Sequence, residues 1–183
     1  MTRLIGIAGS LRKGSINRAL LGAAARAMPD DSELVIAAIR DIPLYNGDLE
    51  ESEGIPAAVS ALQDQIAGSA GLVIATPEYN SGMPGVLKNV MDWLSRPPEQ
   101  IGRVFRDRPV AIMGASPGGF GTISAQATWL PVLKALGART WSGGRMLVSG
   151  AGKVFDDDGR MIDEAVMERL SGFMADFVDF ARR

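Results

Sequence analysis

Short apolar runs alternate along the chain with longer segments of helical spacing, and this alternation restricts the fold more than any other feature. Because parallel strands need crossover connections, which helices supply, it predicts an α/β fold with a parallel sheet. Strands are expected at Leu4–Ala8, Leu34–Ala38, Leu72–Thr76, Val110–Ala115 and Arg145–Ser149. Helices are expected at Ser15–Met28, Pro56–Ala67, Met83–Ser95, Gly121–Leu136 and Asp163–Arg182.

The expected strands are almost continuously apolar, as strands buried on both faces should be. Right-handed crossovers with helices on both faces give a doubly wound sheet, and five strands favour the order 2-1-3-4-5. Ligands bind such sheets at the carboxyl ends of the strands, beside the switch between the first and third strands. We therefore expect the loops after the first, third and fourth strands to form one site. At 183 residues the chain has the size of one compact domain, so we expect residues 1–183 to form a single domain.

Two residue types are absent from the chain, cysteine and histidine. The first absence excludes disulfides, thiolate metal sites and cysteine nucleophiles. The second removes the usual general base, the Ser-His-Asp triad and the commonest metal ligand. A bound cofactor that carries the chemistry fits this composition better, and no metal site is predicted.

The formal net charge is only -2 and the cations are scattered, so no nucleic-acid partner is expected. No apolar run approaches the roughly 20 residues of a spanning helix, and the amino terminus lacks the pattern of a secretory signal. We therefore expect no membrane partner and a cytoplasmic location. The aspartates Asp156 to Asp158 invite a calcium interpretation, but they do not match the EF-hand spacing, which favours a solvated polar loop or hairpin.

The loop after the first expected strand carries groups that suit an anion. It reads Gly9-Ser10-Leu11-Arg12-Lys13-Gly14-Ser15-Ile16-Asn17 and opens a helix at about Ser15. A helix N-terminus with hydroxyls, an amide and a guanidinium suits a phosphate monoester. The loop is neither a P-loop, because Ser15 stands where the lysine should be, nor a G-x-G-x-x-G fingerprint. The alternative is that Ser15 only caps the helix and the two glycines form the turn.

The loop after the third expected strand contains Pro77-Glu78-Tyr79-Asn80. An aromatic ring and the free amides of a turn, relaxed here by Gly82, can lie along the edge of a planar heterocycle such as a flavin. Pro84 is predicted at the first position of the next helix, and Trp93 is predicted in the core rather than at a cofactor.

The loop after the fourth expected strand contains Ser116-Pro117-Gly118-Gly119. Its adjacent glycines allow a ligand to approach the backbone closely.

These motifs together resemble the NADPH-dependent FMN reductase family, which includes bacterial quinone, chromate and azo-dye reductases. The resemblance runs from the first strand to about Leu136 and implies a flavodoxin-like fold that binds FMN. It implies that the FMN phosphate is held by Ser10, Arg12, Ser15, Ile16 and Asn17. It further implies that the isoalloxazine ring is lined by Pro77, Glu78, Tyr79 and Asn80, and closed on its other edge by Ser116, Pro117, Gly118 and Gly119.

The resemblance also implies the reaction. FMN would be the bound cofactor, NADPH or NADH the co-substrate, and a quinone, azo compound, chromate or free flavin the small-molecule electron acceptor. With no histidine or cysteine, no catalytic side chain is assigned; flavin N5 would take the hydride and both substrates would use one face in turn, so ping-pong kinetics is predicted. The alternative is a flavodoxin-type electron carrier without its own NAD(P)H oxidase activity, which usually needs an acidic docking face that a net charge of -2 argues against.

Three further expectations concern assembly and substrates. Relatives often pair so that the flavin lies at a subunit boundary, which implies a homodimer or homotetramer. Several relatives have an additional aromatic residue and a serine where this chain has Ser81 and Gly82, and this departure bears on substrate stacking rather than on flavin binding. With Arg12 assigned to FMN, the sequence offers no obvious partner for the 2′-phosphate of NADPH.

Overall fold

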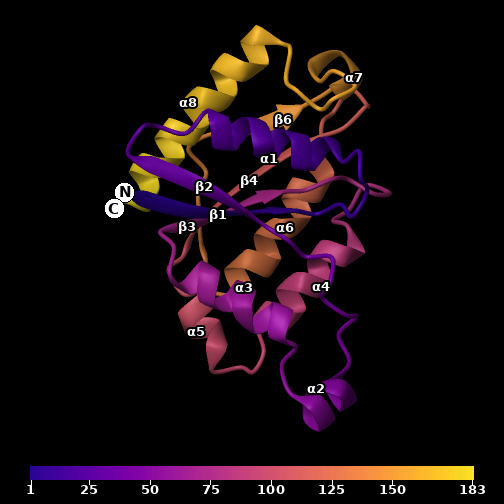
Figure 1. The fold of residues 1–183 in the computed structure, drawn as a ribbon, viewed down its shortest axis with the longest axis vertical. Coiled ribbons are helices and arrows are strands. Elements are labelled where there is room, and N and C mark those ends of the chain that lie inside the picture. Colours follow the sequence, from indigo (N-terminus) through magenta and orange to yellow (C-terminus); the bar gives the residue numbers. More distant parts are fainter.

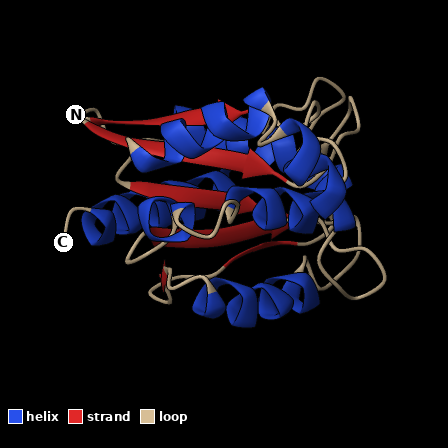
Figure 2. Cartoon of the chain, turned by 90° about the horizontal axis from the view of Figure 1, so that it is seen from below, coloured by secondary structure: helices blue, strands red, loops and turns tan.

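The computed structural model describes all 183 residues and has a parallel sheet at its centre. The strands are β1 (Thr2–Ala8), β2 (Ser32–Ala37), β3 (Gly71–Ala75), β4 (Pro109–Ala115), β5 (Arg139–Thr140) and β6 (Met146–Val148). Their order is β2-β1-β3-β4-β5, with β6 also paired to β4, so the predicted topology is confirmed and one strand is added. Figure 2 shows the strand arrowheads pointing toward the same edge of the sheet, where long loops gather.

Helices cover both faces of this sheet (Figure 1). They are α1 (Ile16–Arg26), α2 (Gly47–Glu53), α3 (Ala57–Ala67), α4 (Gly85–Leu94), α5 (Gln100–Val104), α6 (Ile123–Ala135), α7 (Ala151–Val154) and α8 (Glu164–Ala181). Side chains alternate along β1, so Leu4 packs with α1 and α8 in one core cluster, whereas Ile5 and Ile7 pack with α3, α4 and α6 in the other. None of the helices combines the length and the apolar character that crossing a membrane would require.

The position of the fifth strand is divided between β5 and β6. β5 pairs with the start of β4 and β6 pairs with its end, whereas residues 141–145 leave the sheet. Trp141 turns away to pack against Phe173, with ring centroids 4.8 Å apart. A Cβ on Gly143 or Gly144 would meet this indole ring at 2.5 or 2.8 Å, so the two glycines make room for it. The expected strand Arg145–Ser149 corresponds to β6, and the two-residue β5 was not predicted.

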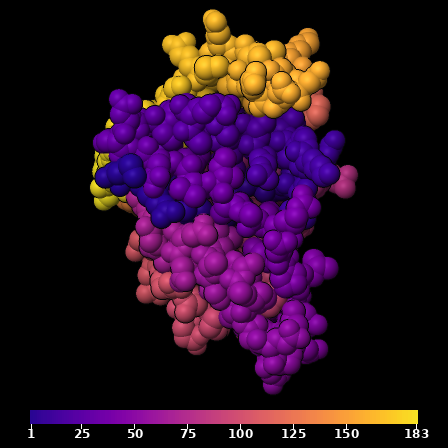
Figure 3. Space-filling view, in the orientation of Figure 1, coloured from indigo at the N-terminus to yellow at the C-terminus, as the bar shows by residue number.

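Residues 42–54 form an arm that projects from the α3–α4 end of the molecule (Figures 1 and 3). Residues 42–46 form no helix or strand, and they lead into α2, which has no buried residue and was not predicted. The Pro43 carbonyl accepts a hydrogen bond from Trp93 Nε1 at 2.9 Å, and Trp93 is fully buried, as predicted. Glu50 in α2 pairs with Arg96 at 2.8 Å, and this hydrogen bond lowers the pKa of Glu50 below its usual range. These contacts fasten the arm to α4 and to the residues just after it.

The three consecutive aspartates lie in a polar hairpin, as predicted. Phe155 and Met161 form an antiparallel bridge, and the Asp156 carboxylate accepts the N–H of Arg160 at 2.7 Å. No three His, Cys, Asp or Glu side chains come together in a group that could hold a metal ion.

Candidate functional site

The loops that follow β1 and β3 are packed directly against each other. A Cβ on Gly9 would meet Pro77 Cδ at 2.9 Å and Pro84 Cγ at 3.0 Å, so the absence of a side chain allows this approach. The hydroxyl of Tyr79 lies 3.5 Å from Ser10 Oγ. The carboxyl edge of the sheet therefore brings the first two predicted loops together. In the alternative interpretation of the sequence, Gly9 helps to form the turn, and the structure adds this packing role.

Ser15 is the N-cap of α1. Its Oγ accepts a hydrogen bond from the N–H of Arg18 at 3.2 Å, and the residue is 7% exposed. The capping role considered from the sequence is thus present. It does not exclude an anion, because a hydroxyl that accepts one hydrogen bond still has its own hydrogen to donate.

Backbone donors without protein acceptors are concentrated in residues 10–17. Only the N–H of Arg12 donates to a protein atom, Ser10 Oγ at 3.4 Å, and the Arg12 guanidinium is exposed and makes no ion pair. Free N–H groups at the start of a helix, beside a guanidinium, form a binding site for an anion. The free donors are the N–H groups of Ser10, Leu11, Lys13, Gly14, Ser15, Ile16 and Asn17.

The side chain of Asn17 joins α1 to the end of β4. Asn17 is 1% exposed; its Nδ2 donates to the Ala115 carbonyl at 3.0 Å and its Oδ1 accepts the Ala115 N–H at 2.9 Å. The sequence predicts that this amide contacts an anion, but in the structure both Oδ1 and Nδ2 are hydrogen-bonded to the backbone of Ala115. One Nδ2 hydrogen and the backbone N–H remain as donors. Asn17 therefore fixes the place where the third loop begins.

The second loop ends in a tight turn at Tyr79–Gly82. Tyr79 and Gly82 exchange two backbone hydrogen bonds of 3.1 Å, and the residues between them, Asn80 and Ser81, have φ values of 51° and 60°. Two central residues with positive φ define a type I′ turn. The expectation that Gly82 relaxes this turn is wrong, because the left-handed conformation falls on Asn80 and Ser81. The turn presents the Tyr79 ring, which is 48% exposed, at the tip of the loop.

Glu78 connects the second loop to the third. Its Oε2 accepts the N–H of Ala125 at 3.0 Å in the first turn of α6, where Thr122 gives no side-chain cap. The carboxylate thus acts as a cap for that helix. Pro77 is buried beneath the loop. Pro84, predicted at the first helical position, is instead the N-cap of α4, which begins at Gly85 rather than at Met83.

Backbone hydrogen bonds to β6 and to the residues just after it hold the third loop in place. The Ser116 N–H donates to the last residue of β6 at 2.9 Å, and the Gly118 carbonyl accepts the N–H of Gly150 at 3.0 Å. Pro117, Gly118 and Gly119 are exposed, and a Cβ on Gly119 would meet nothing within 4 Å. The loop therefore offers an open, fixed stretch of backbone that a flat ligand can reach.

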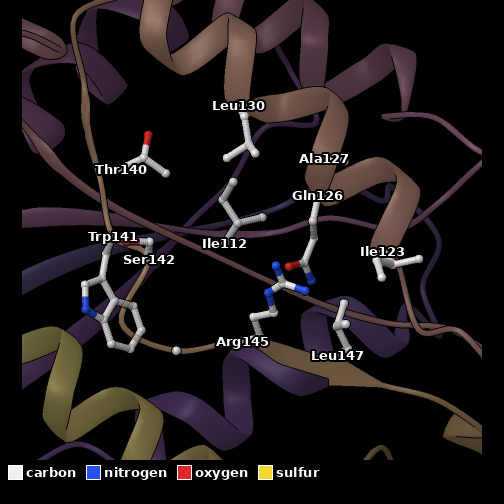
Figure 4. A pocket seen from close by; sticks show the side chains of 11 residues that line it. Ile112, Ile123, Gln126, Ala127, Leu130, Thr140, Trp141, Ser142, Arg145 and Leu147 are labelled. Carbon is white, nitrogen blue, oxygen red and sulfur yellow. The ribbon is translucent and has the colours of Figure 1, made fainter.

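A separate cavity of about 220 Å³ lies between α6 and the break in the fifth strand (Figure 4). None of the predicted site residues lines it. Its walls are mainly apolar, and the Arg145 guanidinium points into it beside Gln126. The residues around this cavity are Ile112, Ile123, Gln126, Ala127, Leu130, Thr140, Trp141, Ser142, Gly144, Arg145 and Leu147.

Comparison with known proteins identifies the family of this chain. Residues 2–153 match the family described as NADPH-dependent FMN reductase. The chain belongs to this family. It is 43% identical over 168 residues to an NAD(P)H-dependent FMN reductase of Pseudomonas aeruginosa, and the aligned region covers 92% of this chain and 89% of that protein. It is 36% identical over 183 residues to a quinone reductase of Escherichia coli (strain K12), covering 99% and 96% of the two chains.

A solved structure gives the same assignment. FerB, a flavoenzyme NAD(P)H:(acceptor) oxidoreductase from Paracoccus denitrificans, superposes with a TM-score of 0.88 and 32% identity over 100% of this chain and 98% of that chain. The resemblance read from the loop motifs and the flavodoxin-like fold are confirmed. The family member described here is an oxidoreductase that uses FMN and a reduced nicotinamide.

Proposed function

We propose that this protein holds FMN across its three loops and passes electrons from NAD(P)H to quinones or similar small acceptors by a ping-pong reaction. The row of free N–H groups in residues 10–17, located where the first loop meets Tyr79, is the observation that carries the proposal. When bound, FMN would supply the redox chemistry, namely acceptance of a hydride from the nicotinamide and two-electron reduction of the acceptor. The similarity to a quinone reductase favours quinones, and azo compounds, chromate and free flavin are the other acceptors proposed.

Each loop has a task in this proposal. The first loop binds the phosphate with backbone N–H groups, two hydroxyls and one guanidinium, all of which are donors. The second loop places an aromatic side chain and turn amides along the ring, and the third lets its exposed backbone lie against the opposite edge. The proposed FMN contacts are Ser10, Arg12, Ser15, Ile16, Asn17, Pro77, Glu78, Tyr79, Asn80, Ser116, Pro117, Gly118 and Gly119. For Asn17 and Glu78 we assign the contact to the backbone, because their side chains are directed to Ala115 and Ala125.

The proposal is tested by anaerobic titration of the FMN-loaded protein. Addition of NADPH should bleach the visible flavin band, and addition of a quinone should restore it. Steady-state rates with both substrates varied should give parallel double-reciprocal lines, whereas intersecting lines would contradict the ping-pong order. A protein that binds FMN but oxidises neither NADPH nor NADH would be an electron carrier instead.

Replacement of Arg12 tests the phosphate site. We expect Arg12→Ala to weaken FMN binding by about 10- to 100-fold, because a hydrogen bond to a charged group contributes about 1.5–3 kcal/mol. Flavin fluorescence quenching measures the Kd directly. Arg26→Ala, at the opposite end of α1, is the matched control and should bind FMN normally. Unchanged affinity in Arg12→Ala would refute this assignment of the first loop.

We further propose that the chain works as one domain in a cytoplasmic homodimer or homotetramer. Large apolar side chains run from the third loop along α6 and are exposed: Phe120 by 82%, Ile123 by 44% and Leu130 by 52%. Ile123 and Leu130 also line the cavity of Figure 4, and an exposed apolar patch of this kind often marks an interface with another protein. Sedimentation velocity tests the assembly, and a single species with the mass of one chain would contradict it.

A further inference from the structure

The first loop borders a second cavity, which lies on its β2 side and has a volume of about 420 Å³. We call it the β2-side cavity; it is formed by Ala8, by residues 10–13, by Arg18 and by residues 36–41. Four cationic side chains line it, Arg12, Lys13, Arg18 and Arg40, and Asp41 is its one carboxylate. In a chain with a net charge of -2, this is a local excess of positive charge.

These cations are not neutralised by the protein. The side chains of Lys13 and Arg18 form no ion pair or hydrogen bond with the chain, and Asp41 is in no ion pair. Arg40 Nη2 donates to the Leu11 carbonyl, which ties the segment after β2 to the first loop. Unpaired cations around a concave surface focus positive potential and attract a multiply charged anion.

The proposed FMN phosphate does not account for all of them. That phosphate is one dianion, and the free N–H groups of residues 10–17 with Arg12 already supply enough donors for it. Arg18 also faces a neighbouring cavity that contains Asp156, Asp157 and Asp158, but no ion pair joins it to them. Arg18 and Arg40 therefore remain available to a second anionic group.

We propose that the β2-side cavity binds the 2′-phosphate of NADPH, with Arg18 and Arg40 as the residues that select NADPH over NADH. This inference rests on the proposed function. Ser10 and Arg12, both assigned to the FMN phosphate, line the cavity, and Ser10 Oγ lies 3.5 Å from the hydroxyl of Tyr79, so the cavity directly adjoins the proposed FMN site. The guanidinium fork matches phosphate geometry, and the 2′-phosphate is the one group that distinguishes NADPH from NADH.

The first test compares the two nicotinamides on FMN-loaded protein. In Arg18→Gln and Arg40→Gln, kcat/KM for NADPH should fall about 10-fold or more, as expected for loss of a charge-assisted contact, whereas kcat/KM for NADH should change less than about twofold. Arg26→Gln is the matched control, because it removes the same charge from the last turn of the same helix, outside the cavity. FMN affinity is measured for every variant, since Arg40 also contacts the first loop.

The second test measures binding without turnover. By calorimetry on FMN-loaded protein, 2′,5′-ADP should bind more tightly than 5′-AMP, and this difference should disappear in the Arg18→Gln/Arg40→Gln double variant. Equal losses with NADPH and NADH would place these cations on the pyrophosphate that both share, and an unchanged NADPH/NADH ratio with weaker FMN binding would place them on FMN; either result overturns the inference and leaves the proposed function standing. Failure of the parent protein to bind FMN or to oxidise either nicotinamide would overturn both.

Discussion

Gly114→Ala is expected to lower the free energy of unfolding by about 3 kcal/mol, as overpacking at a fully buried site does. Gly114 lies near the carboxyl end of β4, and a Cβ there would overlap Thr122 Oγ1 and the backbone oxygen of Thr76. Thr76 cannot easily give way, because its Oγ1 donates to the Pro77 carbonyl at 2.9 Å and accepts Trp129 Nε1 at 3.1 Å. The substitution should also weaken FMN binding, since it pushes the second and third loops apart.

Urea unfolding with and without FMN measures both effects. Gly172→Ala is the control, because Gly172 lies within α8 and a Cβ there would meet nothing within 4 Å. That change should stabilise the protein by about 0.5–1 kcal/mol, the usual advantage of alanine over glycine inside a helix. If Gly114→Ala unfolds at the same urea concentration as the parent protein, the packing of β4 described above is wrong.

Asn17→Ala is expected to destabilise the FMN-free protein by about 3 kcal/mol. The change leaves the N–H and carbonyl of Ala115 without the amide that satisfies them, and each unpaired buried group costs about 1–3 kcal/mol. The destabilisation should be present before FMN is added, because the lost hydrogen bonds connect α1 to β4 within the protein itself. A residue that served only as a phosphate ligand would instead leave the FMN-free protein unchanged.

The control for this change is Asn46→Ala. Asn46 caps the exposed helix α2 by accepting the N–H of Asp48 at 3.0 Å, and the loss of such a cap costs about 1 kcal/mol. FMN affinity measured beside chemical unfolding separates the two roles of Asn17. Normal stability together with weak FMN binding would show that its side chain serves the ligand rather than the fold.

The sheet could be predicted from the sequence because its strands are buried on both faces. Because β3 and β4 are completely buried, their sequences are continuous apolar runs, which a surface strand would not have. The alternation of such runs with helical segments favours the observed strand order. α2 was missed for the opposite reason, since a helix with no buried residue has no apolar periodicity. Its capping signals, Asn46 followed by Asp48 and Glu50, were visible and could have indicated it. The short β5 depends on how Trp141 packs, which a local pattern cannot show.

The meeting of the predicted loops at one edge of the sheet could be foreseen from the sequence, but the direction of their side chains could not. The rule for doubly wound sheets locates the three loops, and the loop residues indicate an anion and a flat ring. An amide or carboxylate in such a loop can face a ligand or the backbone equally well, and Asn17 and Glu78 face the backbone. Arg18 and Arg40 are far apart in sequence, so their shared cavity emerges only when the end of β2 is placed beside the first loop.

The split in the fifth strand has a consequence for behaviour at high concentration. A long, straight edge strand exposes unpaired backbone groups to which the sheet of another molecule can add, and this is a common route to aggregation. Here the edge beside β4 offers two residues in β5 and three in β6, separated by the turn at Trp141. The sheet of a second molecule therefore cannot extend this edge in a continuous ladder, and the break protects this edge from edge-to-edge association.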